Sequence, residues 1–442
     1  MLGERRVLFV LLVALVVGIP AGVLGAMCFG NACGETRTTV SDVPFCSLPP
    51  ETRSLLAAGF REDRSPHVMA VTGVTAVRGN SAVPGGPWPS EVVGDEGTVP
   101  LVFAGTGVDP GAEPAQGSTL DAVAPTIAEV IGLRRPHPGV RSGTAVPGLA
   151  SSDRPRLVLE VVWKGSGARD LERAPERWPV LRRLMQLGAA TLEAEVGSRP
   201  LDHAAVMTTI GTGGLPRDHG ITGSVLRNED GAVASAWVDE EAPLSVIAGL
   251  GDDLDELLDQ EPRIGLVATD LADLGLIGGN WYVSHDRDDV LTSNRPDTQV
   301  RMVRRLLDDG YGADGTPDLL GVTLDAPIAE MDRALGGLIE AARMASGDSV
   351  LIVVTSTGSM DPDGTDPVTA RAVQRDAERA LGDGVVEAMA QGGLFLRQDE
   401  LAARGISDDR VVMVLRDMRT HVDERMFADA FPGLAVTFAR YC

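Results

Sequence analysis

Four nearly uninterrupted apolar segments of strand length constrain the fold of this chain more than any other feature. They are residues 156–163 (RLVLEVVW), 263–270 (RIGLVATD), 318–324 (DLLGVTL) and 349–356 (SVLIVVTS). A strand with one solvated face alternates apolar and polar residues, whereas a strand buried on both faces is apolar along its length. Segments with helical periodicity, such as residues 328–345, alternate with these strands. The sequence therefore predicts an α/β fold with a mainly parallel sheet covered by helices on both faces.

Lys164, the only lysine of the chain, follows the first of these segments in VVWKGSG. In open α/β sheets ligands bind beyond the carboxyl ends of the strands. Lys164 and the turn TSTGSM at residues 355–360 lie at such ends, so we expect them to face the same crevice. A buried ammonium needs a partner, and Asp325, just after residues 318–324, is a candidate. A lysine whose charged end reaches solvent is the plainer alternative.

The N-terminus has the pattern of a membrane anchor. Residues 1–6 carry two arginines, and residues 7–27 are uncharged and long enough to span a bilayer as a helix. The positive charges predict that residues 1–6 stay in the cytoplasm and that the remaining chain is extracytoplasmic, attached to the cell membrane by a single span. A cleaved signal peptide is the alternative, with Gly30 and Ala32 as the small residues of the cleavage site.

Charge excludes one class of partner. The formal net charge is −24, and no basic stripe is present that would neutralise phosphates. We therefore expect no nucleic-acid partner.

The four cysteines fit an oxidising compartment, where disulfides form. Cys28, Cys33, Cys46 and Cys442 allow three pairings. A bridge from the segment after the predicted anchor to the C-terminus and a local Cys33–Cys46 loop both remain open.

Composition divides the chain further. Residues 28–65 read as a tether, and residues 66–442 as the α/β domain. Within this domain we expect four parts. They are an early segment (66–134), a Pro- and Gly-rich linker (135–155), the core (156–360) and a C-terminal extension (361–442). In the extension, residues 410–415 (RVVMVL) and 434–442 (LAVTFARYC) read as strands, and the acidic residues 251–261 read as an exposed helix face.

Three motifs resemble one known family. MTTIGTGGLPRDHGITG at residues 207–223, the strand and turn at 349–360, and the segment 98–134 are similar to type I phosphodiesterases and nucleotide pyrophosphatases of the alkaline phosphatase superfamily. The resemblance implies an alkaline-phosphatase-like core, a Thr or Ser nucleophile and two zinc or similar divalent ions. The segment 98–134 precedes the core here, whereas in the family it follows the core. We therefore expect a circular permutation, with partial duplication as the alternative.

The residues that would carry the family's chemistry are mostly replaced. Lys164 stands where the resemblance places an Asp ligand, and Thr357 and Gly358 stand where it places an Asp-His pair. His203 falls at the nucleophile position, and a shifted alignment offers Ser198 instead. Asp325 is the one ligand that could survive. The predicted pocket therefore contains Lys164, His203, Asp325, Thr357 and Gly358, with Ser198 and His203 as catalytic candidates, and no metal cofactor is expected.

These features predict a pseudoenzyme, anchored in the membrane and extracytoplasmic, with a binding or scaffolding role at the cell envelope. Its partner would be an anionic small molecule, a lipid headgroup or an envelope protein. An active phosphodiesterase or related hydrolase is the first alternative, and its rebuilt site would need Ser198, His203, Asp325 and the pair His285–Asp286. A structural protein is the second alternative, and its crevice would be filled by Trp163, Met207 and Met360.

Overall fold

The computed structural model describes most of the chain from Phe45 onward. The described ranges are residues 45–73, 77–78, 88–109, 111–239, 242–279, 281–282, 288–360, 368–390, 392–420 and 423–442. None of the helices in these ranges is both long and apolar enough to cross a membrane. The predicted anchor, residues 7–27, lies outside the described residues, as do Cys28, Cys33 and the pair His285–Asp286.

A seven-stranded sheet forms the larger part of the domain, in the order β5-β3-β11-β4-β10-β8-β9. The strands are β3 (Thr98–Gly105), β4 (Leu157–Trp163), β5 (Ala189–Glu195), β8 (Ile264–Ala268), β9 (Asp289–Thr292), β10 (Asp318–Leu324) and β11 (Val350–Ser356). Strand β4 runs parallel to both β10 and β11, and β8 runs parallel to β10 and β9. Strand β3 is antiparallel to both of its neighbours, β5 and β11, and so runs opposite to the other six strands of this sheet. The predicted mainly parallel sheet is confirmed.

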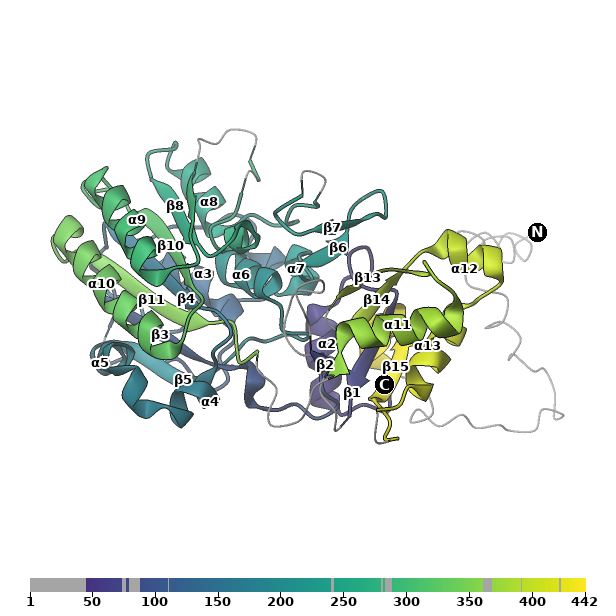
Figure 1. Ribbon diagram of the computed structural model, residues 1–442. Helices are drawn as coiled ribbons and strands as arrows, with labels where there is room; N and C mark the ends of the chain where they lie inside the picture. Colours follow the sequence, from purple (N-terminus) through teal and green to yellow (C-terminus); the bar gives the residue numbers. More distant parts are fainter. Residues whose placement is uncertain are drawn as a thin grey trace, which may run out of the picture. The chain divides into compact units, whose positions relative to one another are not determined.

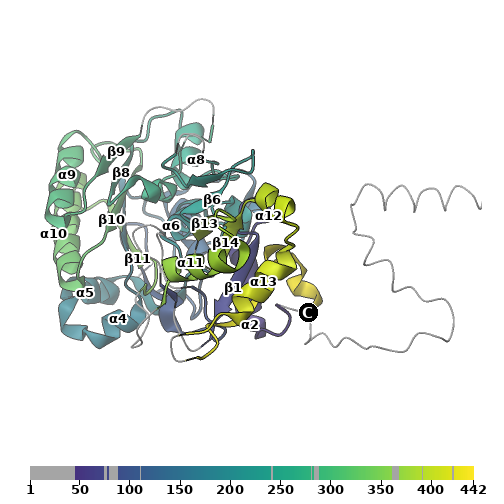
Figure 2. The ribbon, with the colours of Figure 1, turned by 45° about the vertical axis from the view of Figure 1, so that its right-hand side comes forward.

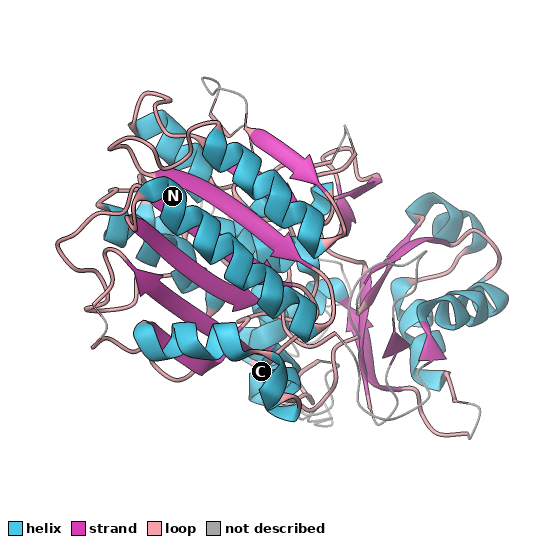
Figure 3. Cartoon of the chain, turned by 60° about the vertical axis from the view of Figure 1, so that its left-hand side comes forward, coloured by secondary structure: helices cyan, strands magenta, loops and turns pink. Residues whose placement is uncertain are grey.

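Helices cover both faces of this sheet, as predicted (Figure 1, Figure 3). One face contacts α3 (Val123–Ile131), α6 (His203–Thr212) and α8 (Leu250–Leu257), and the other contacts α5 (Pro179–Leu187), α9 (Pro296–Asp308) and α10 (Ile328–Ser346). Val158 and Val162 of β4 point to the first group, whereas Leu159 and Val161 point to the second. Successive side chains of a strand point to opposite faces, which is why the buried strands are apolar along their length.

Short elements complete this part of the domain. They are α4 (Ala168–Arg173), α7 (Pro216–His219), the hairpin strands β6 (Val225–Arg227) and β7 (Val233–Ser235), and the 3-10 turns η3 (Asp95–Gly97), η4 (Leu120–Ala122), η5 (Pro138–Val140), η6 (Pro175–Arg177) and η7 (Leu271–Leu276).

A second sheet combines an early strand with three late ones. Its antiparallel order is β13-β14-β1-β15, with β1 (Val68–Thr72), β13 (Val386–Ala390), β14 (Gly393–Leu396) and β15 (Phe427–Pro432). Helices α11 (Ala370–Leu381), α12 (Gln398–Arg404) and α13 (Asp408–Asp417) follow the same part of the chain, and α11 and α13 lie together against this sheet (Figure 2). The remaining elements are α2 (Pro50–Gly59), η8 (Gly433–Tyr441) and the short pair β2 (Val77–Arg78) and β12 (Val368–Thr369).

A disulfide joins Cys46 to Cys442. It settles the pairing left open by the sequence, because Cys46 is not available for a local loop. Residues next to both cysteines, among them Phe45 and Val436, share one small apolar core.

Two predicted strands of the C-terminal extension are wrong. Residues 410–415 lie in α13, where the side chain of Ser407 caps the helix and Val411, Val412 and Leu415 are buried at helical spacing. Residues 434–442 lie almost entirely in η8, a helical turn that follows Pro432. Runs of β-branched residues favoured strands, but capping and the spacing of the buried side chains determine the structure.

The acidic segment 251–261 is also not simply an exposed face. Asp253 of α8 is fully buried and accepts hydrogen bonds from Arg135 (2.6 Å) and Arg141 (3.0 Å). Both arginines also donate to the carbonyl oxygens of Thr212 and Ala248. The Pro- and Gly-rich segment 135–155 is therefore tied to α6 and α8.

Glu160 is a buried carboxyl group in the middle of β4. Its side chain points to the same face as Val158 and Val162, and its Oε1 atom has no hydrogen-bond partner. Burial raises the pKa of Glu160 to about 8, because the charged form is poorly solvated.

We predict that Glu160→Gln flattens the pH dependence of stability. A pKa raised from about 4.5 to about 8 means that the wild type loses stability as the pH rises between these values, by on the order of 4 kcal/mol. The Gln variant lacks this loss, so its melting temperature should exceed that of the wild type progressively from pH 5 to pH 8. Circular dichroism melts at each pH provide the measurement, with Glu129→Gln on the exposed side of α3 as the control. A constant difference between Glu160→Gln and wild type across this range would contradict the prediction.

Candidate functional site

The carboxyl ends of β4, β8, β10 and β11 meet at one edge of the larger sheet. Lys164 follows β4, and its side chain lies on the face covered by α3, α6 and α8, with only 4% of it exposed. Its Nζ atom donates to Thr269 Oγ1 (2.8 Å), Asp270 Oδ2 (3.2 Å) and Asp273 Oδ1 (2.8 Å). An ammonium has three N–H donors, so all of them are in use. The alternative of a lysine that reaches solvent is wrong.

Asp273 is the buried partner of this ion pair. It lies in η7, and its side chain is fully buried. Its second oxygen, Oδ2, accepts hydrogen bonds from the hydroxyl groups of Thr269 (2.8 Å) and Thr323 (2.6 Å). Both carboxylate oxygens therefore have partners, which is the condition under which a buried ion pair is tolerated.

The pKa values of the pair shift in the directions that favour the charged forms. Burial alone would lower the pKa of Lys164, but Asp273 and Asp270 outweigh it and raise the pKa above its usual value. Burial alone would raise the pKa of Asp273, but Lys164 outweighs it and the pKa lies below its usual value. Lys164 and Asp273 are therefore both charged across the physiological pH range.

His203 and Thr357 form a second contact at this edge. His203 is the first residue of α6, and Asp202 caps this helix by accepting hydrogen bonds from the backbone N–H groups of Ala204 and Ala205. The imidazole Nδ1 lies 3.0 Å from Thr357 Oγ1, which also accepts a hydrogen bond from the backbone N–H of Gly165. Burial lowers the pKa of His203 and the charge of Lys164 lowers it further, so the ring is neutral at pH 7.

The turn after β11 requires glycine at position 358. Gly358 has a φ of +86°, and a Cβ atom there would lie 2.6 Å from the carbonyl oxygen of Glu96. The next residue, Ser359, donates its backbone N–H to the same carbonyl (2.7 Å), and its hydroxyl donates to Asp170. This turn is thus held against η3 and α4.

The structure brings some of the predicted site residues together and leaves others apart. Lys164, His203 and Thr357 meet at the strand ends, and Asp325 lies exposed just past β10, where its charge acts on His203. The expectation that Asp325 pairs with Lys164 is wrong, because Asp270 and Asp273 are the partners.

Ser198 lies in the segment between β5 and α6. It is buried, and its carbonyl oxygen accepts a hydrogen bond from Arg199. Among the contacts of the described residues, none joins Ser198 to Lys164 or His203.

The three residues expected to fill the crevice of a purely structural protein do not meet. Trp163 belongs to the core on the side of α5, α9 and α10, whereas Met207 and Met360 belong to the core on the opposite face.

His219 has a structural role. It is fully buried, accepts a hydrogen bond from the backbone N–H of Ile221 at Nδ1 (3.1 Å), and contacts Thr209 Oγ1 through Nε2 (3.1 Å). Burial lowers its pKa to about 3, so it is neutral.

Sequence reasoning missed four polar residues around Lys164. They are Thr269, Asp270, Asp273 and Thr323. A signal was present, since Thr269 and Asp270 end the segment RIGLVATD, which the pattern identified as a parallel strand. The carboxyl ends of parallel strands share one edge, so these residues belonged with Lys164.

The residues at this edge do not fit the pair of divalent ions that the family resemblance implies. Metal ions of this kind need several anionic or imidazole ligands, and the described residues contain no cluster of three His, Cys, Asp or Glu side chains suited to one. The ammonium of Lys164 stands at the strand end, and Asp273 has no oxygen left without a partner. At position 358 a His ligand would require the backbone to move.

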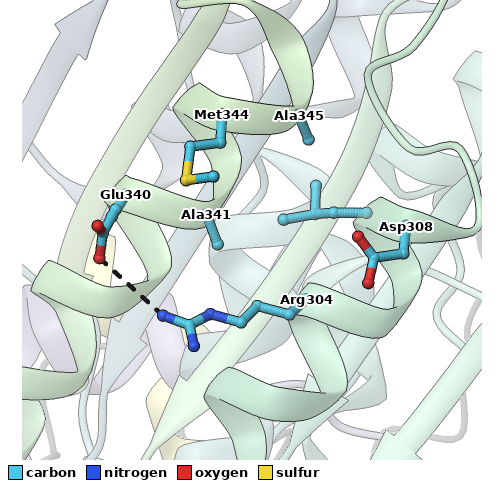
Figure 4. Close-up of a pocket in the computed structure, with 7 residues that line it drawn as sticks. Arg304, Asp308, Glu340, Ala341, Met344 and Ala345 are labelled. Atoms are coloured by element: carbon cyan, nitrogen blue, oxygen red, sulfur yellow. Dashed lines mark ion pairs between the residues drawn. The ribbon is translucent and has the colours of Figure 1, made fainter.

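The described pockets lie away from these strand ends. One, of about 500 Å³, lies between α9 and α10. Figure 4 shows that Arg304 and Glu340 face each other across it, at 4.0 Å. Both side chains are more than half exposed, so this ion pair contributes little. A neighbouring groove between α5 and α10 shares Glu340 and the exposed Met344. Neither groove carries a set of groups suited to catalysis.

Of the comparisons with known proteins, only the one with solved structures gives matches. No model of a protein family and no curated protein matches the chain. Among solved structures, alkaline phosphatase PafA matches with 13% identity over 60% of this chain and 76% of its own, at a TM-score of 0.43. Phosphonoacetate hydrolase from Sinorhizobium meliloti 1021, in complex with phosphonoacetate, matches with 16% identity over 60% and 74%, at 0.35. Murine ectonucleotide pyrophosphatase/phosphodiesterase 5 matches with 16% identity over 46% and 57%, at 0.34.

These matches are partial and of low identity. No residue role is transferred from them. The permuted order stays a prediction.

We predict that Asp273→Ala destabilises the protein by roughly 3–5 kcal/mol, because it leaves a buried ammonium with only one exposed carboxylate. The stabilisation should be present above the usual Asp pKa of 3.8 and be lost as the pH falls through the lowered value. Denaturant unfolding of the purified chain measures both effects.

The control for this prediction is Asp325→Ala, which removes an exposed carboxylate and should change stability by less than about 0.5 kcal/mol. The double variant Lys164→Met/Asp273→Leu should recover most of the loss. Equal effects of Asp273→Ala and Asp325→Ala would contradict the assignment of Asp273 as the partner.

Proposed function

We propose that this chain is a pseudoenzyme with an alkaline-phosphatase-like fold, held at the outer surface of the cell membrane by residues 7–27, with a scaffolding role at the cell envelope. The observation that carries the proposal is the buried pair of Lys164 and Asp273. A positive charge supplied by the chain itself occupies the strand end at which the resemblance places an anionic metal ligand.

Electrostatics supports the loss of metal chemistry. A dication a few ångströms from an ammonium is repelled by several kcal/mol at intermediate dielectric. The remaining acidic groups do not compensate, because Asp273 is bonded to Lys164, Thr269 and Thr323. Binding two metal ions would require breaking this network.

The same network bears on the class of partner. The three donors of Lys164 are used inside the protein, whereas Asp270 and Asp325 are exposed beside it. These two exposed carboxylates repel anions, so they do not favour an anionic small molecule or an anionic lipid headgroup at this edge of the sheet. Of the predicted partner classes, an envelope protein is therefore favoured for the strand-end surface.

The proposed location rests on the apolar segment 7–27 and on cysteine chemistry. A disulfide such as Cys46–Cys442 persists in oxidising compartments and is rare in the cytoplasm. It is compatible with a domain on the outer side of the membrane.

A second candidate function, hydrolysis at a rebuilt site, is favoured by the contact between His203 and Thr357. A hydroxyl beside a neutral imidazole is the arrangement of an activated nucleophile. However, Thr357 is fully buried, so a substrate would not reach its hydroxyl without rearrangement. Hydrolysis of bis(p-nitrophenyl) phosphate by the wild type that is lost in His203→Ala and kept in Asp325→Asn would support this candidate.

We predict that the purified chain retains no divalent metal. The chain is incubated with zinc, manganese and calcium, desalted, and its metal content measured by mass spectrometry. Retention of about two ions per chain would refute the pseudoenzyme proposal. Lys164→Met is the matched variant, and it should also retain none, since the other ligands are missing. Metal bound by Lys164→Met and not by wild type would show that the ammonium alone excludes it.

A further inference from the structure

The last helical turn of the chain, η8, has two faces of different character. Gly433 and Val436 are buried, and the face that they mark contacts α2 and the small core that contains Phe45. Leu434, Phe438 and Tyr441 lie on the other side, with exposures of 47%, 55% and 66%. Residues three apart share a face of a 3-10 helix, so Phe438 and Tyr441 lie on one exposed face, and Leu434 lies on the adjacent exposed face with Thr437 and Arg440.

Two exposed rings and one guanidinium of η8 lie close together. The rings of Phe438 and Tyr441 lie 6.3 Å apart between centroids, and the guanidinium of Arg440 lies 4.8 Å from the centroid of the Tyr441 ring. We call Leu434, Phe438, Arg440 and Tyr441 the C-terminal patch. Aromatic residues with an apolar body and a polar end, together with arginine, are typical of protein surfaces at the headgroup level of a bilayer.

The covalent structure places this patch next to the point where the chain from the predicted anchor joins the domain. Phe45 is the first described residue, and the next residue, Cys46, is bonded to Cys442, which directly follows Tyr441. Residues 28–44 separate the predicted span from Phe45 and could reach at most about 60 Å when extended. Such a tether permits contact with the membrane but does not enforce it, so a docked domain needs a surface that binds lipid.

We propose that the C-terminal patch docks onto the lipid surface of the membrane in which the chain is anchored. This inference rests on the anchoring proposed above. The patch inserts Phe438 and Leu434 among the lipid headgroups, and Arg440 pairs with lipid phosphate. Docking fixes the height and orientation of the domain, which the tether alone would leave free.

The test uses the full chain in vesicles of phosphatidylethanolamine and phosphatidylglycerol. The photoreactive residue p-benzoylphenylalanine replaces Phe438, and lipid adducts are counted by intact-mass spectrometry after illumination. The matched controls carry the same residue at two exposed positions on other helices, Met413 of α13 and Met344 of α10. We expect several-fold more lipid adducts at position 438 than at either control.

A second variant separates docking from proximity. Leu434→Ser and Tyr441→Ser, added to the photoreactive chain, should reduce the adducts at position 438 to the level of the controls, because they remove the other large apolar side chains of the patch. Equal adducts at positions 438 and 344, adducts unaffected by the serine substitutions, or adducts to protein instead of lipid would each overturn the inference.

Failure of the anchor is recognised independently. If alkaline carbonate releases the chain from the membrane, the proposed anchoring is wrong. The adducts are then counted on chain added to preformed vesicles of the same composition, where their absence overturns the patch as a lipid-binding surface as well. A chain that resists carbonate but gives no lipid adducts refutes the docking alone.

Discussion

The contact between Lys164 and Asp273 links three strands of the larger sheet at their carboxyl ends. Lys164 follows β4, Asp273 follows β8, and Thr323 belongs to β10, which lies between them. The ammonium extends over the central strand, and the hydroxyl of Thr323 supports the carboxylate that receives it. A buried charge of either sign would be costly without the other, so neither residue can be changed by itself at low cost. This mutual dependence limits ligand binding at the edge of the sheet, because the N–H donors of Lys164 and the carboxylate oxygens of Asp273 already have partners inside the protein.

Strands β4, β8, β10 and β11 were predictable because burial on both faces makes a strand apolar along its length. The edge strands β5 and β9 contain exposed residues and were not predicted. The start of α6 was predictable too, since an Asp N-cap acts on the backbone of its own helix. The partner of Lys164 was not, because it depends on the lateral order of the strands. Sequence proximity to a strand end suggested Asp325, which lies exposed past the neighbouring β10, whereas the side chain of Lys164 reaches past that strand to the end of β8. The strand predicted at residues 410–415 was wrong for another reason. The β-branched residues of this segment favour a strand, but the cap at Ser407 and the helical spacing of the buried side chains produce helix α13.

Buried ion pairs inside the domain also fix the position of a segment that has little regular secondary structure. The chain between α3 and β4 contains little helix or strand, yet two of its arginines converge on Asp253 and on the carbonyl oxygens of Thr212 and Ala248. A carboxylate that seemed to belong to a solvated helix face instead fixes this segment. In both places a single Asp on the side of α3, α6 and α8 organises cationic side chains from a different part of the chain.

The bond between Cys46 and Cys442 closes a very long loop, because the two cysteines are 396 positions apart in the sequence. Every helix and strand of the two sheets described above lies inside this loop. In the loop-closure model such a crosslink lowers the entropy of the unfolded chain by the equivalent of about 6 kcal/mol at 25 °C. The unfolded state of the oxidised protein is therefore a closed ring, and reduction of this one bond would enlarge the set of conformations against which the folded domain competes.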